Sequence, residues 1–255
     1  MKPPSSRYSR SAASDPVDGV LLVDKPAGLT SHDVVDRIRR RFRFRKVGHG
    51  GTLDPMATGL LVILVGRGTR LSERVMASDK AYEGVMRLGV RTDTEDVDGR
   101  ILSEADASGV SEEAVRLAMA RRVGDLLQTP PMISAIKKDG VPLYKLARQG
   151  RTVERSPRLI HLYEFSLLNY EPPRARFRLS CTKGTYVRTL CADIGEELGC
   201  GAFLESLRRL AAGGFRVADA HPLSALLEME PPAFLDCVIP VHRLEWDHEH
   251  GARGG

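Results

Sequence analysis

The sequence predicts a mixed α+β fold built around a largely antiparallel sheet. Apolar runs of strand length recur between turn residues along the 255-residue chain. In residues 174–181, apolar residues alternate with arginine or serine, which is the period-two pattern of a strand with one solvent-exposed, cationic face. The predicted strands and single helices follow one another without the strict alternation of a β-α-β fold. A content of 42% apolar and 28% charged residues suits a folded chain with a substantial core.

The first elements follow from apolar runs and capping residues. Residues 1–18 contain serine, proline and arginine but no apolar segment, so we expect a disordered basic tail rather than a signal peptide. Residues 19–23 form an apolar run of strand type, which ends at Lys25-Pro26-Ala27-Gly28. Thr30 or Ser31 can then cap a helix, whose apolar positions are Val34, Val35, Ile38 and Phe42.

The middle of the chain contains two predicted strands and an acidic loop. Residues 60–65 are uninterrupted apolar residues, which indicates a buried strand, and residues 80–90 predict another. The acidic loop contains Asp93, Glu95, Asp96 and Asp98. Because it lacks the ligand spacing of an EF-hand, we interpret it as a solvated turn, with metal binding as the alternative. A helix is expected from Ser111 to about Arg122.

The second half of the chain continues with alternating strands and helices. We expect a short helix from Leu143 to Gly150, then two strands, then a helix from Tyr186 to Leu198. An amphipathic stretch completes the predicted globular region, with its apolar residues at Phe203, Leu204, Leu207 and Leu210. A short helix over residues 222–229 precedes a polar tail.

Composition narrows the class of protein. The net charge of +5 favours an acidic partner. The four cysteines show neither C-x-x-C spacing nor paired histidines, so neither a metal site nor a disulfide framework is indicated. No apolar run approaches the roughly 20 residues that a membrane span requires. We therefore expect a cytoplasmic protein with reduced thiols and no membrane contact.

The loop over residues 48–59 is the most distinctive segment. Its four glycines and one proline exclude a regular helix or central strand, and they surround a single carboxylate, Asp54. A basic run precedes it, so a lone acid lies beside a surface suited to a polyanion. The loop has no second carboxylate for glycosidase chemistry, and the chain has no phosphate-binding P-loop. What remains is a nucleophile or base kept ionised by a cation, for which Arg188 is the best candidate. An aspartate that merely forms a turn is the alternative.

The loop and several other segments resemble the TruB family of RNA pseudouridine synthases. The resemblance extends from about Gly19 to Leu210. The matching blocks are, in order, Asp24 to Ser31, His49 to Pro55 with Ala57 and Gly59, Lys80-Ala81-Tyr82, Arg87-Leu88-Gly89 with Arg91 to Thr94, Gln128 to Lys137, Lys183 to Arg188, and Leu207-Arg208-Arg209-Leu210.

This resemblance implies the pseudouridine synthase fold and the isomerisation of uridine 55 in the T-loop of tRNA, with no cofactor or metal, because substrate and product are isomers. Asp54 takes the position of the catalytic aspartate, and Arg188 that of the arginine paired with it through a bidentate contact. Tyr82 matches the tyrosine that stacks on the extruded uracil. Tyr186 and Leu207 match pocket walls, for which plain core packing is the alternative. His49 matches the residue that fills the space the base leaves, unless it only hydrogen-bonds its own backbone.

The resemblance also implies contacts with the T-arm and elbow of tRNA. We expect phosphate contacts from Arg40, Arg41, Arg43, Arg45, Lys46, Arg176 and Lys183. Residues 19–230 should form one catalytic domain with inserts, followed by a short extension over 231–255 in place of a full C-terminal RNA-binding domain of the PUA type. No obligate protein partner is expected. A tRNA chaperone that refolds the elbow without Asp54 chemistry, and an enzyme guided by RNA or acting on another RNA, are the competing functions.

Overall fold

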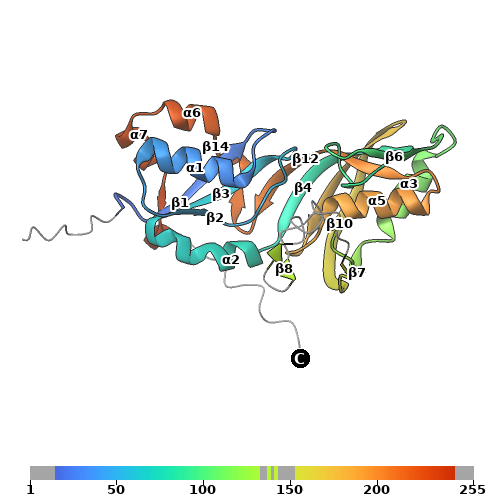
Figure 1. Cartoon of the computed structure of the whole chain (residues 1–255), viewed down its shortest axis with the longest axis horizontal. Coiled ribbons are helices and arrows are strands. Elements are labelled where there is room, and N and C mark those ends of the chain that lie inside the picture. The colour runs from blue at the N-terminus through green and yellow to red at the C-terminus, as the bar shows by residue number, and fades with distance from the viewer. Residues whose placement is uncertain (1–14, 133–136, 139–140, 143–152, 245–255) are drawn as a thin grey trace, which may run out of the picture.

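The computed structural model describes residues 15–132, 137–138, 141–142 and 153–244. Within these residues, one mixed sheet of eleven strands runs along the long axis of the molecule (Figure 1). Its main order is β14-β1-β3-β12-β4-β11-β10-β7, and its strands are β1 (Gly19–Lys25), β2 (Val47–His49), β3 (Thr58–Val65), β4 (Lys80–Leu88), β7 (Gly124–Gln128), β10 (Arg158–Glu171), β11 (Arg174–Cys181), β12 (Ala202–Ala212), β13 (Phe215–Arg216), β14 (His221–Pro222) and β15 (Ile239–Pro240).

Neighbouring strands are antiparallel except for the pairs β1 with β14 and β3 with β12. The predicted largely antiparallel sheet is therefore confirmed. Two short hairpins lie outside the main sheet, β5 (Val90–Thr92) with β6 (Ile101–Glu104) and β8 (Lys137–Lys138) with β9 (Val141–Pro142). The expected helix from Leu143 to Gly150 lies outside the described residues.

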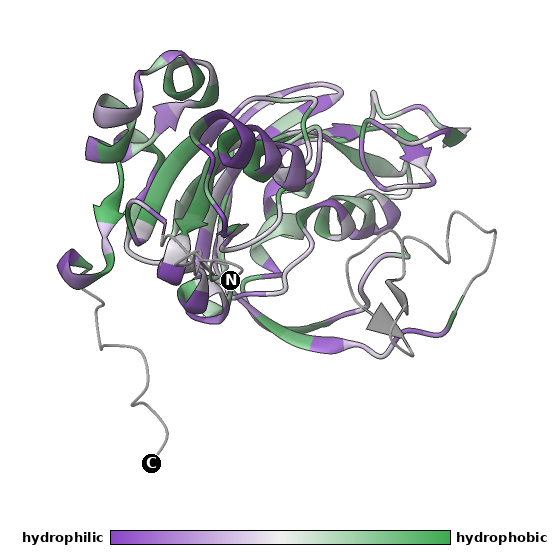
Figure 2. Ribbon diagram, turned by 60° about the vertical axis from the view of Figure 1, so that its left-hand side comes forward, coloured by the Kyte–Doolittle hydropathy of each residue, from purple (hydrophilic) through white to green (hydrophobic). Residues whose placement is uncertain are grey.

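Helices cover both ends of the sheet. Figure 1 shows α1 (Ser31–Phe42), α6 (Leu223–Glu228) and α7 (Pro231–Asp236) at one end, and α3 (Glu112–Ala120) and α5 (Val187–Glu197) at the other. The cap of α1 is Thr30, because Asp33 N donates to Thr30 Oγ1 at 3.0 Å while Thr30 N donates to Asp33 Oδ2 at 2.9 Å. Figure 2 shows hydrophobic residues concentrated on the strands and hydrophilic residues along the helices that cover them.

The strand β3 is apolar throughout because both of its faces are buried. Leu61, Ile63 and Val65 belong to the main core on the side of α1. Leu60, Val62 and Leu64 point to a second apolar cluster, which Val75 of α2 (Ser72–Ala77) helps to close. A strand buried on both faces reads as a continuous apolar run, as the sequence predicted.

The cationic face predicted for β11 is exposed, but its charges are paired. Arg176 Nη2 and Arg178 Nη2 donate to the carboxylate of Glu83 on β4 at 2.9 and 2.7 Å. Arg174 donates twice to Glu205 on β12, at 2.7 and 2.9 Å. The inner face of β11 is buried in the core. The outer face is thus a layer of ion pairs rather than an uncompensated basic surface.

The amphipathic stretch near residue 207 is the strand β12, which creates a fork in the sheet. It pairs with β4 over nearly its whole length, but with β3 only where Arg208 and Arg209 face Thr58 and Gly59. Farther along the same edge of β3, its neighbour is β2, from Val47↔Val65 to His49↔Ile63. The chain from residue 50 to residue 57, which joins β2 to β3, therefore leaves the sheet where two strands diverge.

The end of the described chain packs on the main body. Phe234 of α7 is fully buried and its ring stacks on that of Phe42 of α1, with centroids 3.5 Å apart and an interplanar angle of 18°. The strand β15 pairs with β1. Residues 231–240, expected as a short extension, are thus held by the core of residues 19–230.

Candidate active site

The loop that carries Asp54 is held by hydrogen bonds from Lys25, the buried lysine of β1. Lys25 Nζ donates to Pro55 O at 3.2 Å, to Leu29 O at 2.7 Å and to Pro26 O at 2.8 Å. Burial lowers the pKa of Lys25 to about 8, against a smaller opposite effect of the Asp54 charge. Because its donors are used by three carbonyls, Lys25 supports the loop rather than facing a substrate.

Two further contacts fix the backbone on either side of Asp54. Leu53 N donates to Ser31 Oγ at 2.8 Å, and Gly28 N donates to Pro55 O at 2.8 Å. Gly50 lies against α2, where a Cβ would come within 2.3 Å of a Val75 methyl carbon. The chain around Asp54 is therefore tied to β1, to the start of α1 and to α2.

Asp54 is brought to Arg188 at the start of α5, as expected. Arg188 Nη1 lies 3.5 Å from Asp54 Oδ2, and the arginine side chain is only 5% exposed while that of Asp54 is 36% exposed. This nearest approach is longer than the about 2.7–2.9 Å typical of a charge-assisted hydrogen bond.

The acidic loop, interpreted as a solvated turn, supplies a second buried carboxylate. Asp96 Oδ2 lies 3.2 Å from the same Arg188 nitrogen, and the Asp96 side chain is 6% exposed. The neighbouring Glu95 accepts a hydrogen bond from Thr189 Oγ1 at 2.6 Å. The solvated-turn interpretation is wrong for Asp96, because α5 presents a buried cation that this loop must cover. Among the described residues, no group of three or more histidine, cysteine or acidic side chains could hold a metal ion.

The electrostatics of Asp54 follow from this arrangement. Burial raises its pKa above the ordinary value, and the charges of Asp96 and Asp98 add to the rise. Arg188 lowers the pKa but does not cancel the effect of burial. Arg188 thus stabilises the carboxylate less completely than the sequence argument assumed.

The two tyrosines predicted for the site lie in defined environments. Tyr82 on β4 is 9% exposed, and burial raises the pKa of its phenol to about 12. Tyr186 precedes α5, where its N–H donates to Gln128 Oε1 at 2.8 Å and its carbonyl accepts from Gln128 Nε2 at 3.0 Å. The Arg188 guanidinium carbon lies 5.9 Å from the centroid of the Tyr186 ring. Tyr186 is therefore adjacent to the Asp54–Arg188 pair.

The position of Leu207 suits both a pocket wall and plain core packing. The position of His49 suits both a residue that fills the space left by the base and one that hydrogen-bonds its own backbone. Leu207 is 7% exposed, belongs to the main core and lies opposite Gly84 on the strand that carries Tyr82. His49 is partly buried at the end of β2, and its Nδ1 accepts a hydrogen bond from Gly51 N at 3.3 Å. Burial lowers the pKa of His49, so the neutral ring is favoured.

The basic residues expected on phosphates are dispersed. Arg40, Arg43 and Lys46 are exposed on α1 and the segment after it, and Lys183 is exposed before α5. Arg41 instead donates to Leu227 O and Met229 O, at 3.0 and 2.8 Å, and so attaches α1 to the end of α6. The backbone of Arg45 donates to Asp15. Arg176 lies on the sheet face opposite Tyr82, with its charge paired to Glu83, which argues against the expected phosphate contact.

Two functional candidates were missed by sequence reasoning. Asp96 is separated from Arg188 by 92 residues, so no spacing rule connects them. Arg209 is 2% exposed and binds the Asp54 loop, whereas the adjacent Arg208 is half exposed on its side chain and pairs with Asp24. Two neighbouring arginines look equivalent in a sequence, and the strand alternation of Arg208 and Arg209 is the signal that could have separated them.

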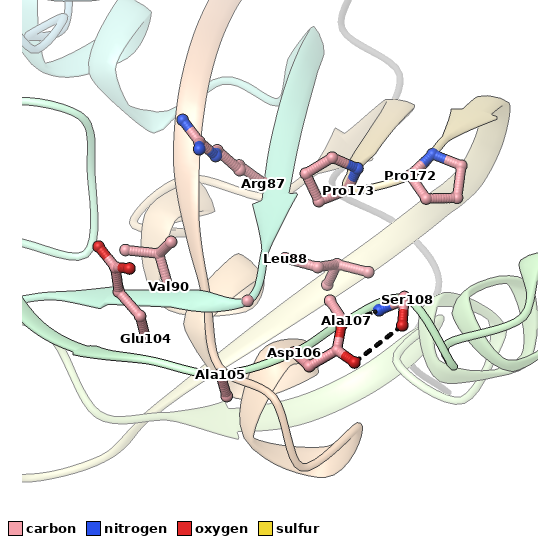
Figure 3. Close-up of a pocket in the computed structure, with 11 residues that line it drawn as sticks. Arg87, Leu88, Val90, Glu104, Ala105, Asp106, Ala107, Ser108, Pro172 and Pro173 are labelled. Carbon is pink, nitrogen blue, oxygen red and sulfur yellow. Dashed lines mark hydrogen bonds between the residues drawn. The ribbon is translucent and has the colours of Figure 1, made fainter.

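A separate hollow of about 570 Å³ lies at the far end of β4. Figure 3 shows Arg87, Leu88 and Pro173 on one side and the segment Glu104 to Ser108 on the other, with Ser108 bonded to Asp106. None of the predicted site residues lines it. The candidate active site is instead the group of Asp54, Asp96 and Tyr186 around Arg188. Tyr82 belongs to it because the Asp54 charge adds to the rise in the pKa of its phenol.

Two protein-family models match the sequence of this chain. Residues 39–187 match the family described as TruB family pseudouridylate synthase (N terminal domain), and residues 188–242 match the tRNA pseudouridylate synthase B C-terminal domain. The boundary falls at the start of α5, inside the range expected as one domain.

Curated relatives of the chain have the same family name. The chain is 52% identical to tRNA pseudouridine synthase B of Opitutus terrae, over 89% of this chain and 94% of the relative. It is 51% identical to the protein of that name from Syntrophotalea carbinolica, over 84% of this chain and 70% of the relative.

Solved structures agree in fold. A chain in the crystal structure of a Cbf5-Nop10-Gar1 complex is 28% identical with a TM-score of 0.70, over 88% of this chain and 60% of that one. A chain in the structure of an H/ACA RNP bound to a substrate RNA containing 2′-deoxyuridine is 26% identical with a TM-score of 0.66 and the same coverage. This chain thus spans about 60% of the length of those chains. From its sequence matches and its fold, the chain belongs to the TruB family of pseudouridylate synthases.

Proposed function

We propose that the chain converts uridine 55 in the T-loop of tRNA to pseudouridine, with Asp54 as the catalytic carboxylate and without a cofactor. Membership of the TruB family makes the chain an isomerase that forms pseudouridine in tRNA. The proposal adds the position in the substrate, the extrusion of the base and the residues that act. The proposed location is the cytoplasm.

The observation that carries the proposal is that Asp54, on a firmly held loop, is paired with Arg188, a buried arginine of α5. The reaction breaks the N1–C1′ bond, turns the uracil and joins C5 to C1′, while C5 loses a proton and N1 gains one. A carboxylate at Asp54 can stabilise or capture the electron-poor C1′ and can accept the proton from C5. Arg188, 3.5 Å away, favours the ionised carboxylate that either role requires.

The remaining site residues suit an extruded base. Removing a base from its stack costs a few kcal/mol, which the protein must recover. We assign to Tyr82 the stacking contact with the uracil, worth about 1–3 kcal/mol, because an aromatic face tolerates a base that turns in its own plane. Tyr186 and Leu207 are proposed as walls of the base pocket. His49 is proposed to fill the space that the base leaves, a role that its neutral ring can serve.

Affinity for tRNA is proposed to come from exposed cations around this site. Arg40, Arg43, Arg45 and Lys46 are exposed on α1 and the segment after it, and Lys183 is exposed before the helix that carries Arg188. Cations of this kind contact phosphates and position the substrate without reading its sequence. Selection of the T-arm and elbow then depends on the folded shape of the RNA and on its unstacked bases.

A tRNA transcript labelled with tritium at uracil C5 tests the proposal directly. Joining C5 to C1′ expels the C5 hydrogen, so wild-type protein should release tritium into water, and a transcript with cytidine at position 55 should abolish that release. Release that persists from the cytidine transcript would place the reaction elsewhere in the RNA. Tight binding without release would favour the chaperone function.

A further inference from the structure

Arg209 fills the fork in the sheet beneath the Asp54 loop. Its Nε donates to Leu60 O of β3 at 2.7 Å, its Nη1 to Thr52 O at 3.3 Å and its Nη2 to Gly51 O at 3.1 Å. The side chain is among the largest that are fully buried in the described part of the protein. All three acceptors are backbone carbonyls, two of them in the loop that precedes Asp54.

The need for this side chain follows from the strand pairing. The edge of β3 is paired with β12 as far as Gly59 and with β2 from Ile63 onward. Between them, Val62 O accepts from Gly50 N at 2.8 Å, and Leu60 O accepts from the Arg209 side chain. Arg209 therefore supplies a hydrogen bond that a strand would otherwise supply, and extends the ladder into the loop.

The backbone of Arg209 is fixed as closely as its side chain. A Cβ at Gly59 would lie 2.3 Å from the Arg209 carbonyl oxygen, and Gly59 has φ +94°. The two chains can approach this closely because Gly59 has no side chain and tolerates the left-handed conformation. The guanidinium thus projects from an anchored point.

Arg209 also faces Tyr82. The two residues are directly opposite each other on β12 and β4, where side chains of paired strands share a face. The charge of Arg209 opposes the burial that raises the pKa of the Tyr82 phenol, which places the two groups near each other. One side chain consequently contacts the loop of the proposed catalytic acid and neighbours the proposed stacking residue.

We propose that Arg209 is a positioning residue, which fixes the Asp54 loop relative to Tyr82 for the isomerisation. This inference rests on the proposed roles of Asp54 and Tyr82. Lysine at this position keeps the charge but cannot direct three nitrogen donors in the plane of a guanidinium. A displacement of about 1 Å in the reacting groups is enough to reduce a rate about a hundredfold.

The test compares Arg209→Lys and Arg209→Met with the wild type, and uses Arg208→Met as the matched control. Arg208 is on the same strand, but its guanidinium donates twice to Asp24 of β1, at 3.0 and 2.7 Å, whereas that of Arg209 donates to Gly51 and Thr52. Three quantities are measured: the single-turnover rate of tritium release from tRNA, the affinity for tRNA, and the amide hydrogen exchange of residues 50–54.

We expect Arg209→Lys to reduce the single-turnover rate by about a hundredfold, with tRNA affinity unchanged and exchange faster at residues 50–54 but not in β10 and β11. Arg208→Met should retain the rate and the protection of the loop. A wild-type rate in Arg209→Lys would overturn the inference, as would parallel losses of rate, affinity and protection throughout the sheet, which a structural role alone produces. If Arg209→Met does not fold, the rate and the hydrogen exchange of Arg209→Lys alone test the inference. If wild-type protein releases no tritium, the proposed function fails, and unchanged exchange in Arg209→Lys would still overturn the claim that Arg209 holds the loop.

Discussion

The guanidinium of Arg188 lies 3.5 Å from the carboxylate of Asp54, and it is shared. The same nitrogen lies 3.2 Å from the buried carboxylate of Asp96. Asp54 thus shares its cation with a second acid, which agrees with the net rise in the pKa of Asp54. The reactivity of Asp54 should therefore depend on both neighbours, in opposite directions.

Removal of the cation should move the pH dependence of the reaction upward. In Arg188→Met the pKa of Asp54 loses its largest lowering influence and rises further. If the ionised carboxylate reacts, the acidic limb of the single-turnover pH profile should shift to higher pH. Arg188→Lys, which keeps a charge, should shift less. An acidic limb unchanged in Arg188→Met would separate Asp54 ionisation from the rate.

Removal of the second acid should have the reverse effect. The charge of Asp96 raises the pKa of Asp54, so Asp96→Asn should lower it and move the acidic limb to lower pH. The maximal rate should fall, because Arg188 loses the buried acceptor at 3.2 Å that orients it. The pH profile of tritium release measures both effects. A limb that moves upward would contradict this account of the site.

The contact between β3 and β12 should tolerate no side chain at residue 59. Gly59→Ala introduces a Cβ at 2.3 Å from the Arg209 carbonyl oxygen, at a residue with φ +94°. We expect a loss of about 1–3 kcal/mol in the free energy of unfolding, measured by urea denaturation. Gly109→Ala is the control, because its Cβ would meet no atom within 4 Å, and it should change stability by less than about 0.5 kcal/mol. Equal stability of the two variants would contradict the close packing at the fork.

Two exposed arginines should differ in their contribution to RNA binding. Arg40→Met should weaken tRNA binding and reduce the slope of log K against log salt concentration by about 0.7–0.9, the value for one phosphate contact. Arg176→Met should leave the slope unchanged, because Arg176 is paired with Glu83 on the sheet face opposite Tyr82. Filter binding at several salt concentrations measures both. A larger change for Arg176 would place RNA on the other face of the sheet.

Local signals in the sequence predicted the elements whose burial pattern is simple. The continuous apolar run of β3 and the residues Thr30 and Ser111, which cap α1 and α3, correspond directly to the structure. The strand β12 could only be described as amphipathic. Register shifts between Leu204 and Ser206 and between Arg209 and Ala211 interrupt its alternation, so its apolar residues fall at irregular spacing.

The site was predictable where one segment contains the information, and not where distant segments meet. The loop glycines and Asp54 adjoin in the chain, and the family resemblance connected them to Tyr82 and Arg188. The burial of Asp96 depends on how the acidic loop folds over α5, and the place of Arg209 depends on the divergence of β12 from β2. Both are consequences of tertiary structure: strand alternation could have separated Arg209 from Arg208, but it could not have placed Arg209 at the loop.

The central claim is that Asp54 reacts, and Asp54→Asn tests it most directly. The substitution keeps the shape of the side chain. Because burial raises the pKa of Asp54, its negative charge does not stabilise the folded protein, and removing that charge should not impair folding. In the tritium-release assay the variant should bind tRNA as tightly as the wild type, refold it equally well and release no tritium. Release at the wild-type rate by Asp54→Asn would contradict the account and leave tRNA binding, without chemistry at Asp54, as the function of this loop.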